Sequence, residues 1–410
     1  MTLSAGTPAG ASSPGPVNPP ADLPSATRPP ARPAGGHLAA VDVVRFLTIA
    51  GVVLVHTTTF ANSTTSLAAN GVLEVAHVTR SVFLMLSAFV LTYSFSRRPL
   101  GRRAFWRRRY PLILAPYLAW SAIYFVTGGG VHASLPVLET FLHDLLDAGA
   151  KFHLYFLLLT MQLYLVFPAL MAALRRWPRA LLPTLGASFG FEMLFTAAVH
   201  YGWRPPVLGV WFSHPDKWLP SYALYVVGGI AAARYFDAVT AWIRAHYRLL
   251  GVAFVASLAV SVASYLLDMS FLGYAPIKAS EVFQPANVLE AVAATAAQFG
   301  LGLWVAERAS TSRLAFLERA SDVSFGLYLA HPLLLGVVLD AADWLGLPGR
   351  LNSWPSGVIE LLIAVAMVPF LYSATFVAVD RVRRTRLSLW LTGRRGPRPA
   401  PAPTPAPAPA

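Results

Sequence analysis

Runs of about twenty apolar residues recur along this chain, and their length limits what it can fold into. A helix needs about twenty such residues to cross the hydrocarbon core of a bilayer. Only 12% of the 410 residues are charged, about half the share of a typical soluble domain. A backbone inside lipid must also satisfy its own hydrogen bonds. We therefore predict an all-α, polytopic membrane helix bundle.

We predict about ten transmembrane helices, which together form one transmembrane domain over residues 38–380. Residues 1–37 are rich in Pro and Ala and are expected to be a disordered tail. Residues 381–410 are basic and then Pro/Ala-rich, and we expect a second disordered tail there. The predicted spans cover residues 39–60, 75–96, 111–127, 152–174, 180–199, 219–236, 248–267, 287–306, 322–340 and 357–379.

The distribution of positive charge predicts the orientation of the bundle. With a cytoplasmic N-terminus, 25 of the 32 Lys and Arg residues fall in cytoplasmic segments and 5 fall in outer ones. Because cytoplasmic loops carry an excess of positive charge, we expect both termini in the cytoplasm and a multi-pass protein of the plasma membrane. The same bias accounts for the net charge of +13 without a nucleic-acid partner.

Two ionisable residues lie inside the first predicted span. Arg45 and His56 are 11 positions apart, so on a helix they share one face and are separated by roughly 16 Å. Asp42 lies one turn before Arg45 and can pair with it. A snorkelling arginine and a histidine bonded between helices are the structural alternative. Ionisable groups within a membrane are nevertheless functional candidates, and a histidine can remove a proton from a hydroxyl.

A strongly basic loop is predicted after the second span. It holds seven arginines between Arg97 and Arg109, the last three being Arg107, Arg108 and Arg109. A plain stop-transfer cluster is one interpretation of this loop. The other is a binding surface for the phosphates of a coenzyme, because a guanidinium offers several donors in a planar fork.

Later spans contribute two more groups of polar residues. His153 and Tyr155 open the fourth span and would lie near the level of His56, although an interfacial position is the alternative. Tyr328 and His331 lie in the ninth span, where Pro332 weakens the helix and a packing role is the alternative.

The order of these elements resembles the acyltransferase 3 family of membrane proteins, and within it the group that modifies exopolysaccharides and other carbohydrates. The resemblance covers roughly Val41 to Val379. The basic loop of this family often has a second arginine three residues after the first. Here Leu112 stands three residues after Arg109, so the second arginine is missing. The matching elements are Arg45-x10-His56 with Asp42, Phe83 to Phe89 with Ser87, the basic loop through Pro116-Tyr117, His153 to Phe156, and Ser324 to Pro332.

This resemblance implies a membrane-bound O-acyltransferase that moves an acyl group from cytoplasmic acyl-CoA to a hydroxyl. The acceptor would be a carbohydrate, a glycolipid or a related small molecule. His56 would be the general base, and Arg45 would orient the donor or stabilise negative charge on the attacked carbonyl. Acyl-CoA would be a co-substrate, with no permanently bound cofactor and no metal. The expected coenzyme-binding residues are Arg107, Arg108 and Arg109, and the substrate-site candidates are Asp42, Ser87, His153, Tyr155, Tyr328 and His331.

Two other functional classes remain open from the sequence. A transporter or flippase for a saccharide or glycolipid would use Arg45, His56 and Glu192 as a path through the membrane. Transporters commonly carry internal repeats, and no such symmetry is visible in this sequence. A non-catalytic scaffold of an envelope assembly is the third interpretation.

Overall fold

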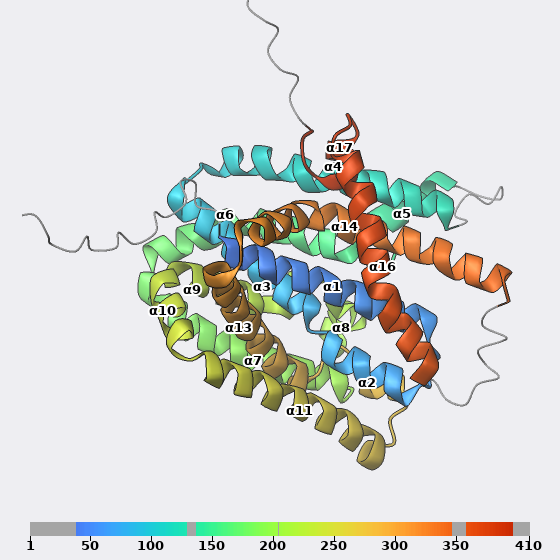
Figure 1. The fold of residues 1–410 in the computed structure, drawn as a ribbon. Coiled ribbons are helices and arrows are strands. Elements are labelled where there is room, and N and C mark those ends of the chain that lie inside the picture. Colours follow the sequence, from blue (N-terminus) through green and yellow to red (C-terminus); the bar gives the residue numbers. More distant parts are fainter. Residues whose placement is uncertain (1–37, 129–136, 204, 347–357, 397–410) are drawn as a thin grey trace, which may run out of the picture. The chain divides into compact units, whose positions relative to one another are not determined.

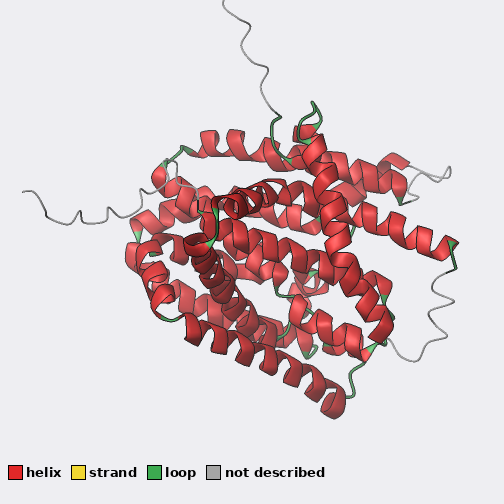
Figure 2. Cartoon of the chain, viewed as in Figure 1, coloured by secondary structure: helices red, strands yellow, loops and turns green. Residues whose placement is uncertain are grey.

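The computed structural model describes residues 38–128, 137–203, 205–346 and 358–396. All regular elements within these ranges are helices, which confirms the predicted all-α class (Figure 2). The predicted N-terminal tail lies outside the described residues. The long helices are α1 (Ala39–Ala61), α3 (Thr79–Arg97), α4 (Arg102–Thr127), α6 (Tyr155–Arg176), α7 (Leu181–His200), α11 (Tyr247–Leu272), α13 (Pro285–Arg308), α14 (Thr311–Trp344) and α16 (Val358–Val382). The shorter ones are α2 (Leu67–Ala76), α5 (Val137–Asp147), α8 (Gly209–Ser213), α9 (Ala223–Arg234), α10 (Phe236–Ala245), α12 (Pro276–Ala279) and α17 (Ser388–Thr392), with 3-10 turns at Pro178–Ala180, Pro206–Leu208, Pro215–Lys217 and Leu219–Tyr222.

The lengths of these helices agree with the predicted membrane spans. Among the described residues, 9 helical stretches are long and apolar enough to cross a bilayer. A bent pair, Leu219–Arg234 and Phe236–Ala245, meets the same test with a 92° bend and corresponds to the remaining predicted span. Apolar side chains also cover outer faces, as on α11, where Val252 and Val255 are 66% and 65% exposed. Such faces suit contact with lipid rather than water.

Helix α1 lies among α3, α13, α14 and α16 and packs against all four (Figure 1). Its residues Val44, Ile49 and Val53 are almost completely buried. The polar residues of α1 are therefore surrounded by other helices on several sides, which is where a membrane protein can hold them at the least cost.

Small residues allow two pairs of helices to approach closely. A Cβ atom added to Gly229 of α9 would lie 2.2 Å from the Met85 carbonyl oxygen of α3. A Cβ added to Gly302 of α13 would lie 2.6 Å from the Ala40 carbonyl oxygen of α1. Glycine is thus required where these backbones meet, as is common between membrane helices.

Among the boundaries that differ from the sequence-based prediction, two bear on the candidate site. Helix α4 begins at Arg102, so five of the seven arginines expected in a loop occupy its first turns, while Arg97 ends α3. Arginine is a good helix former, and a hydropathy boundary marks the edge of the apolar run rather than the end of the helix. At the other end, the ordered chain extends past the boundary predicted at 381, because α17 folds against α4 and α14.

Candidate active site

A pair of histidines joins α1 to α14 at the centre of the candidate site. His56 Nδ1 lies 2.7 Å from His331 Nε2, and the two rings are parallel within 3°. His331 Nδ1 lies 3.1 Å from the Leu327 carbonyl oxygen. Because a carbonyl can only accept a hydrogen bond, His331 carries its proton on Nδ1. With both rings neutral, His331 Nε2 then accepts from His56 Nδ1.

This arrangement fixes the tautomer of His56. Its Nδ1 carries the proton that His331 accepts, so its Nε2 keeps a free lone pair. The half-buried ring of His56 lines a cavity of about 440 Å³, which we call the histidine cavity. A histidine with one nitrogen oriented by a partner and the other unprotonated has the form of a general base.

Several of the sequence-predicted residues meet in this cavity. His153, Tyr155 and Tyr328 line it together with His56. The Tyr328 hydroxyl donates a hydrogen bond to the His153 carbonyl, which ties α14 to the start of α6. The His153 side chain is itself buried, with 1% exposure of the residue. His331 lies behind His56 and orients it rather than lining the cavity.

The histidine cavity also contains ionisable residues that sequence analysis did not select. They are Arg80, His77, Asp216 and Glu281. The Arg80 guanidinium carbon lies 4.3 Å from the centre of the Phe283 ring, a distance typical of a cation–π contact. Arg80 lies inside the second predicted span, at residues 75–96, and a charge within an apolar run is a signal that could have identified it. Both signs of charge in one cavity suit a polar ligand rich in hydroxyl groups.

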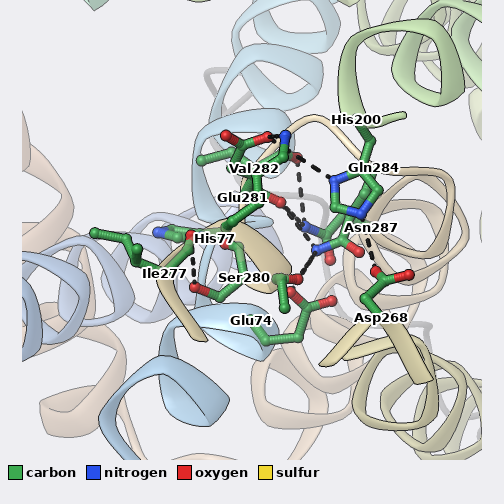
Figure 3. A network of polar contacts seen from close by, with 12 residues as sticks. Glu74, His77, His200, Asp268, Ile277, Ser280, Glu281, Val282, Gln284 and Asn287 are labelled. Carbon is green, nitrogen blue, oxygen red and sulfur yellow. Dashed lines mark hydrogen bonds and ion pairs between the residues drawn. The ribbon is translucent and has the colours of Figure 1, made fainter. Parts of the chain in front are cut away.

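A buried polar network supports one wall of the histidine cavity (Figure 3). Residues 281–283 belong to this wall. Before them, the Ser280 carbonyl lies 3.0 Å from His77 Nδ1. After them, the Gln284 amide donates to the buried Glu74 carboxylate and to the carbonyl of residue 281. Polar side chains thus fix both ends of the wall segment.

A second cavity, of about 540 Å³, lies beside Arg45. Its lining includes Arg45, Ser87 and Arg109, three of the residues selected from the sequence, and no carboxylate among the described residues. Arg45 Nη1 donates to Ser321 Oγ at 3.1 Å, and Ser87 Oγ donates to the Phe83 carbonyl at 2.8 Å. Four further lining residues come from the chain after α16, and they are Gly393 and the arginines Arg383, Arg394 and Arg395. We call this space the arginine cavity, and its charge favours an anion.

Two aromatic residues separate the cavities. Phe83 and Phe156 line both of them, and their ring centres are 5.1 Å apart at an angle of 89°. Tyr328 stands beside them, with its ring centre 5.8 Å from that of Phe156. A group that moved from the arginine cavity to His56 would have to pass this partition.

Besides His331, three predicted site residues lie outside both cavity linings. Asp42 is buried, with 3% exposure, one turn before Arg45. Arg107 and Arg108 are exposed on the first turns of α4, while Arg109 lines the arginine cavity. Consecutive helical residues point about 100° apart, so three adjacent arginines cannot all face one cavity. No cluster of His, Cys, Asp and Glu suited to a metal ion occurs in the described part of the chain.

Comparison with known proteins assigns a family to this arrangement. Residues 38–376 match the family model described as an acyltransferase domain, and the matched range contains both histidines, Arg45 and the aromatic partition. No curated protein and no solved structure gives a significant match.

Proposed function

Since the chain belongs to the acyltransferase 3 family, we propose that it is a membrane-bound O-acyltransferase. The donor is acyl-CoA, and the acceptor is a hydroxyl of a carbohydrate or related molecule. One observation carries the proposal: the contacts among His56, His331 and Leu327 leave His56 Nε2 free to accept a proton in a polar cavity.

We infer that the two cavities hold the two substrates. The arginine cavity suits the phosphorylated coenzyme, because guanidinium groups bind phosphates through paired hydrogen bonds. The histidine cavity suits the acceptor, because it offers both donors and acceptors around His56. The acyl thioester then extends past Phe83 and Phe156 towards His56. In this scheme Arg45 orients the donor, since roughly 16 Å of helix separates it from His56.

The proposed reaction balances without a further reactant. His56 Nε2 removes the proton of the acceptor hydroxyl, and that oxygen attacks the thioester carbonyl carbon. The carbon–oxygen bond forms, the carbon–sulfur bond breaks, and the proton passes from His56 to the departing thiolate. During this exchange His331 Nε2 accepts from His56 Nδ1, which stabilises the positive ring.

The distribution of positive charge along the chain supports an orientation in which the arginine cavity faces the cytoplasm. We propose that both termini and the start of α4 face the cytoplasm, because positive residues concentrate on that side. The arginine cavity, lined by Arg109 of α4 and by Arg394 and Arg395 near the C-terminus, then faces the compartment that contains acyl-CoA.

The test is a direct assay of purified protein in lipid nanodiscs. With labelled acyl-CoA and a panel of saccharide acceptors, the proposal predicts free CoA and a labelled ester in equal amounts. A transporter would instead move saccharide or glycolipid across proteoliposome membranes without consuming thioester. Transport with an intact thioester pool would overturn the proposed function.

A further inference from the structure

The chain after α16 folds back onto the bundle. Helix α17 packs against α4 and α14, and Trp120 Nε1 of α4 donates to the Leu391 carbonyl at 3.1 Å. Gly393 ends α17 with a φ of 66°, and a Cβ added there would lie 2.6 Å from the Leu112 carbonyl oxygen. Only glycine combines this left-handed backbone with such a close approach. The residues that follow therefore have a fixed position.

This fold places arginines at the wall of the arginine cavity. Arg394 forms an ion pair with Asp322 of α14, and the same carboxylate lies 3.5 Å from Arg383 Nη2. Asp322 thus positions two guanidinium groups but balances the charge of only one. Arg395, which is exposed, makes no ion pair within the described part of the chain.

The cavity as a whole has a large excess of positive charge. Arg45 of α1 and Arg109 of α4 line it together with Arg383, Arg394 and Arg395 from the chain after α16. Guanidinium groups brought together from three parts of the chain match a ligand that carries several phosphates, because each can form two parallel bonds to phosphate oxygens. The diphosphate and the 3′-phosphate of coenzyme A have this chemistry.

We propose that residues 383–395 form a donor-binding element, in which Arg394 and Arg395 hold phosphates of acyl-CoA and Asp322 is a positioning residue. This inference rests on the proposed function, because it takes acyl-CoA as the donor. It assigns a binding role to a segment that composition alone indicates to be a tail.

The test is the dissociation constant of CoA for the full-length protein in nanodiscs. Arg395→Gln and Arg394→Gln should each weaken CoA binding about tenfold or more, the order expected for a lost charge-assisted hydrogen bond. Arg386→Gln is the matched control, because Arg386 is exposed in the same segment and does not line the cavity. Arg395 makes no ion pair to described residues, so its replacement should leave the thermal stability unchanged.

Two comparisons separate the outcomes. Nanodiscs of neutral lipid and nanodiscs with phosphatidylglycerol should show the same loss, whereas a loss confined to anionic lipid would mean that these arginines bind lipid headgroups and would overturn the inference. If the wild-type protein binds CoA and both variants bind it equally well, this inference fails while the proposed function stands. If the wild-type protein does not bind CoA, both fail.

Discussion

His331 Nε2 lies 2.7 Å from His56 Nδ1, and this contact determines which nitrogen of His56 faces the cavity. The Leu327 carbonyl holds the proton of His331 on its far nitrogen. The orientation of the proposed base therefore depends on a residue 275 positions away in the sequence. The contact between these two histidines cannot be inferred from their positions in the sequence.

Replacing His331 should slow catalysis without weakening donor binding. In His331→Leu the Nδ1 proton of His56 loses its acceptor, and an unsatisfied buried group costs about 1–3 kcal/mol, which corresponds to roughly 5- to 150-fold in rate. His331→Gln should recover part of the activity, because its side-chain oxygen can accept the same proton. The measurements are kcat with both substrates saturating and the CoA dissociation constant. Equal kcat for His331→Leu and wild type would show that the contact is structural.

Opening the aromatic partition should change the acyl groups that the protein accepts. Phe83→Ala removes one of the two rings that separate the cavities. We expect kcat/KM to rise for butyryl- and hexanoyl-CoA relative to acetyl-CoA, because a longer chain then fits between the cavities. Phe89→Ala is the control, since Phe89 is a buried residue of the same helix that lines neither cavity. The same fractional loss for all three donors would contradict a role in chain selection.

Close packing of α3 and α9 should be sensitive to a single added side chain. In Gly229→Val the new Cβ would meet the Met85 backbone at 2.2 Å. Since a backbone atom cannot move aside, overpacking should cost about 1–3 kcal/mol or more and lower the thermal unfolding temperature in detergent. Gly190→Ala is the control, because no heavy atom lies within 4 Å of the added Cβ. Unchanged stability of Gly229→Val would contradict this close approach of the two helices.

The absence of cysteine permits a direct test of orientation. Single-cysteine variants at Arg108 and Val207 occupy exposed positions, and Val207 is 95% exposed. A membrane-impermeant maleimide should label Val207→Cys in intact cells and Arg108→Cys only after permeabilisation. The reverse pattern would place the arginine cavity on the outer side and remove the argument for a cytoplasmic donor.

The sequence predicted the spans because the apolar runs match the thickness of a bilayer. Helix α1 was predicted at 39–60 and extends over Ala39–Ala61. The sharp bend after Arg234 was not predicted, because hydropathy reports the length of an apolar run and not its direction. The start of α4 was placed too late because hydropathy marks the edge of an apolar run and not the first residue of the helix.

The site was predicted in part, and the omissions share one cause. Ionisable residues inside apolar runs, such as Arg45 and His56, can be identified from the sequence because burying them in a membrane costs free energy. Arg394 and Arg395 follow the last span, where basic residues are expected on topological grounds, so their position at a cavity depends on tertiary contacts such as that of Trp120 with Leu391. The orienting contact of His331 also depends on how α1 and α14 pack.

The central claim is that His56 removes the proton of the acceptor, and His56→Ala tests it most directly. Acyl transfer would be measured at saturating acyl-CoA and acceptor, beside His143→Gln, whose exposed histidine lies in α5. Normal membrane insertion and thermal stability of both variants would be verified first. A general base contributes about 10²–10⁴-fold to a rate, so we expect a loss of that order for His56→Ala, with its CoA dissociation constant within a few-fold of wild type. A well-folded His56→Ala protein that transfers acyl groups at nearly the wild-type rate would contradict the proposed mechanism.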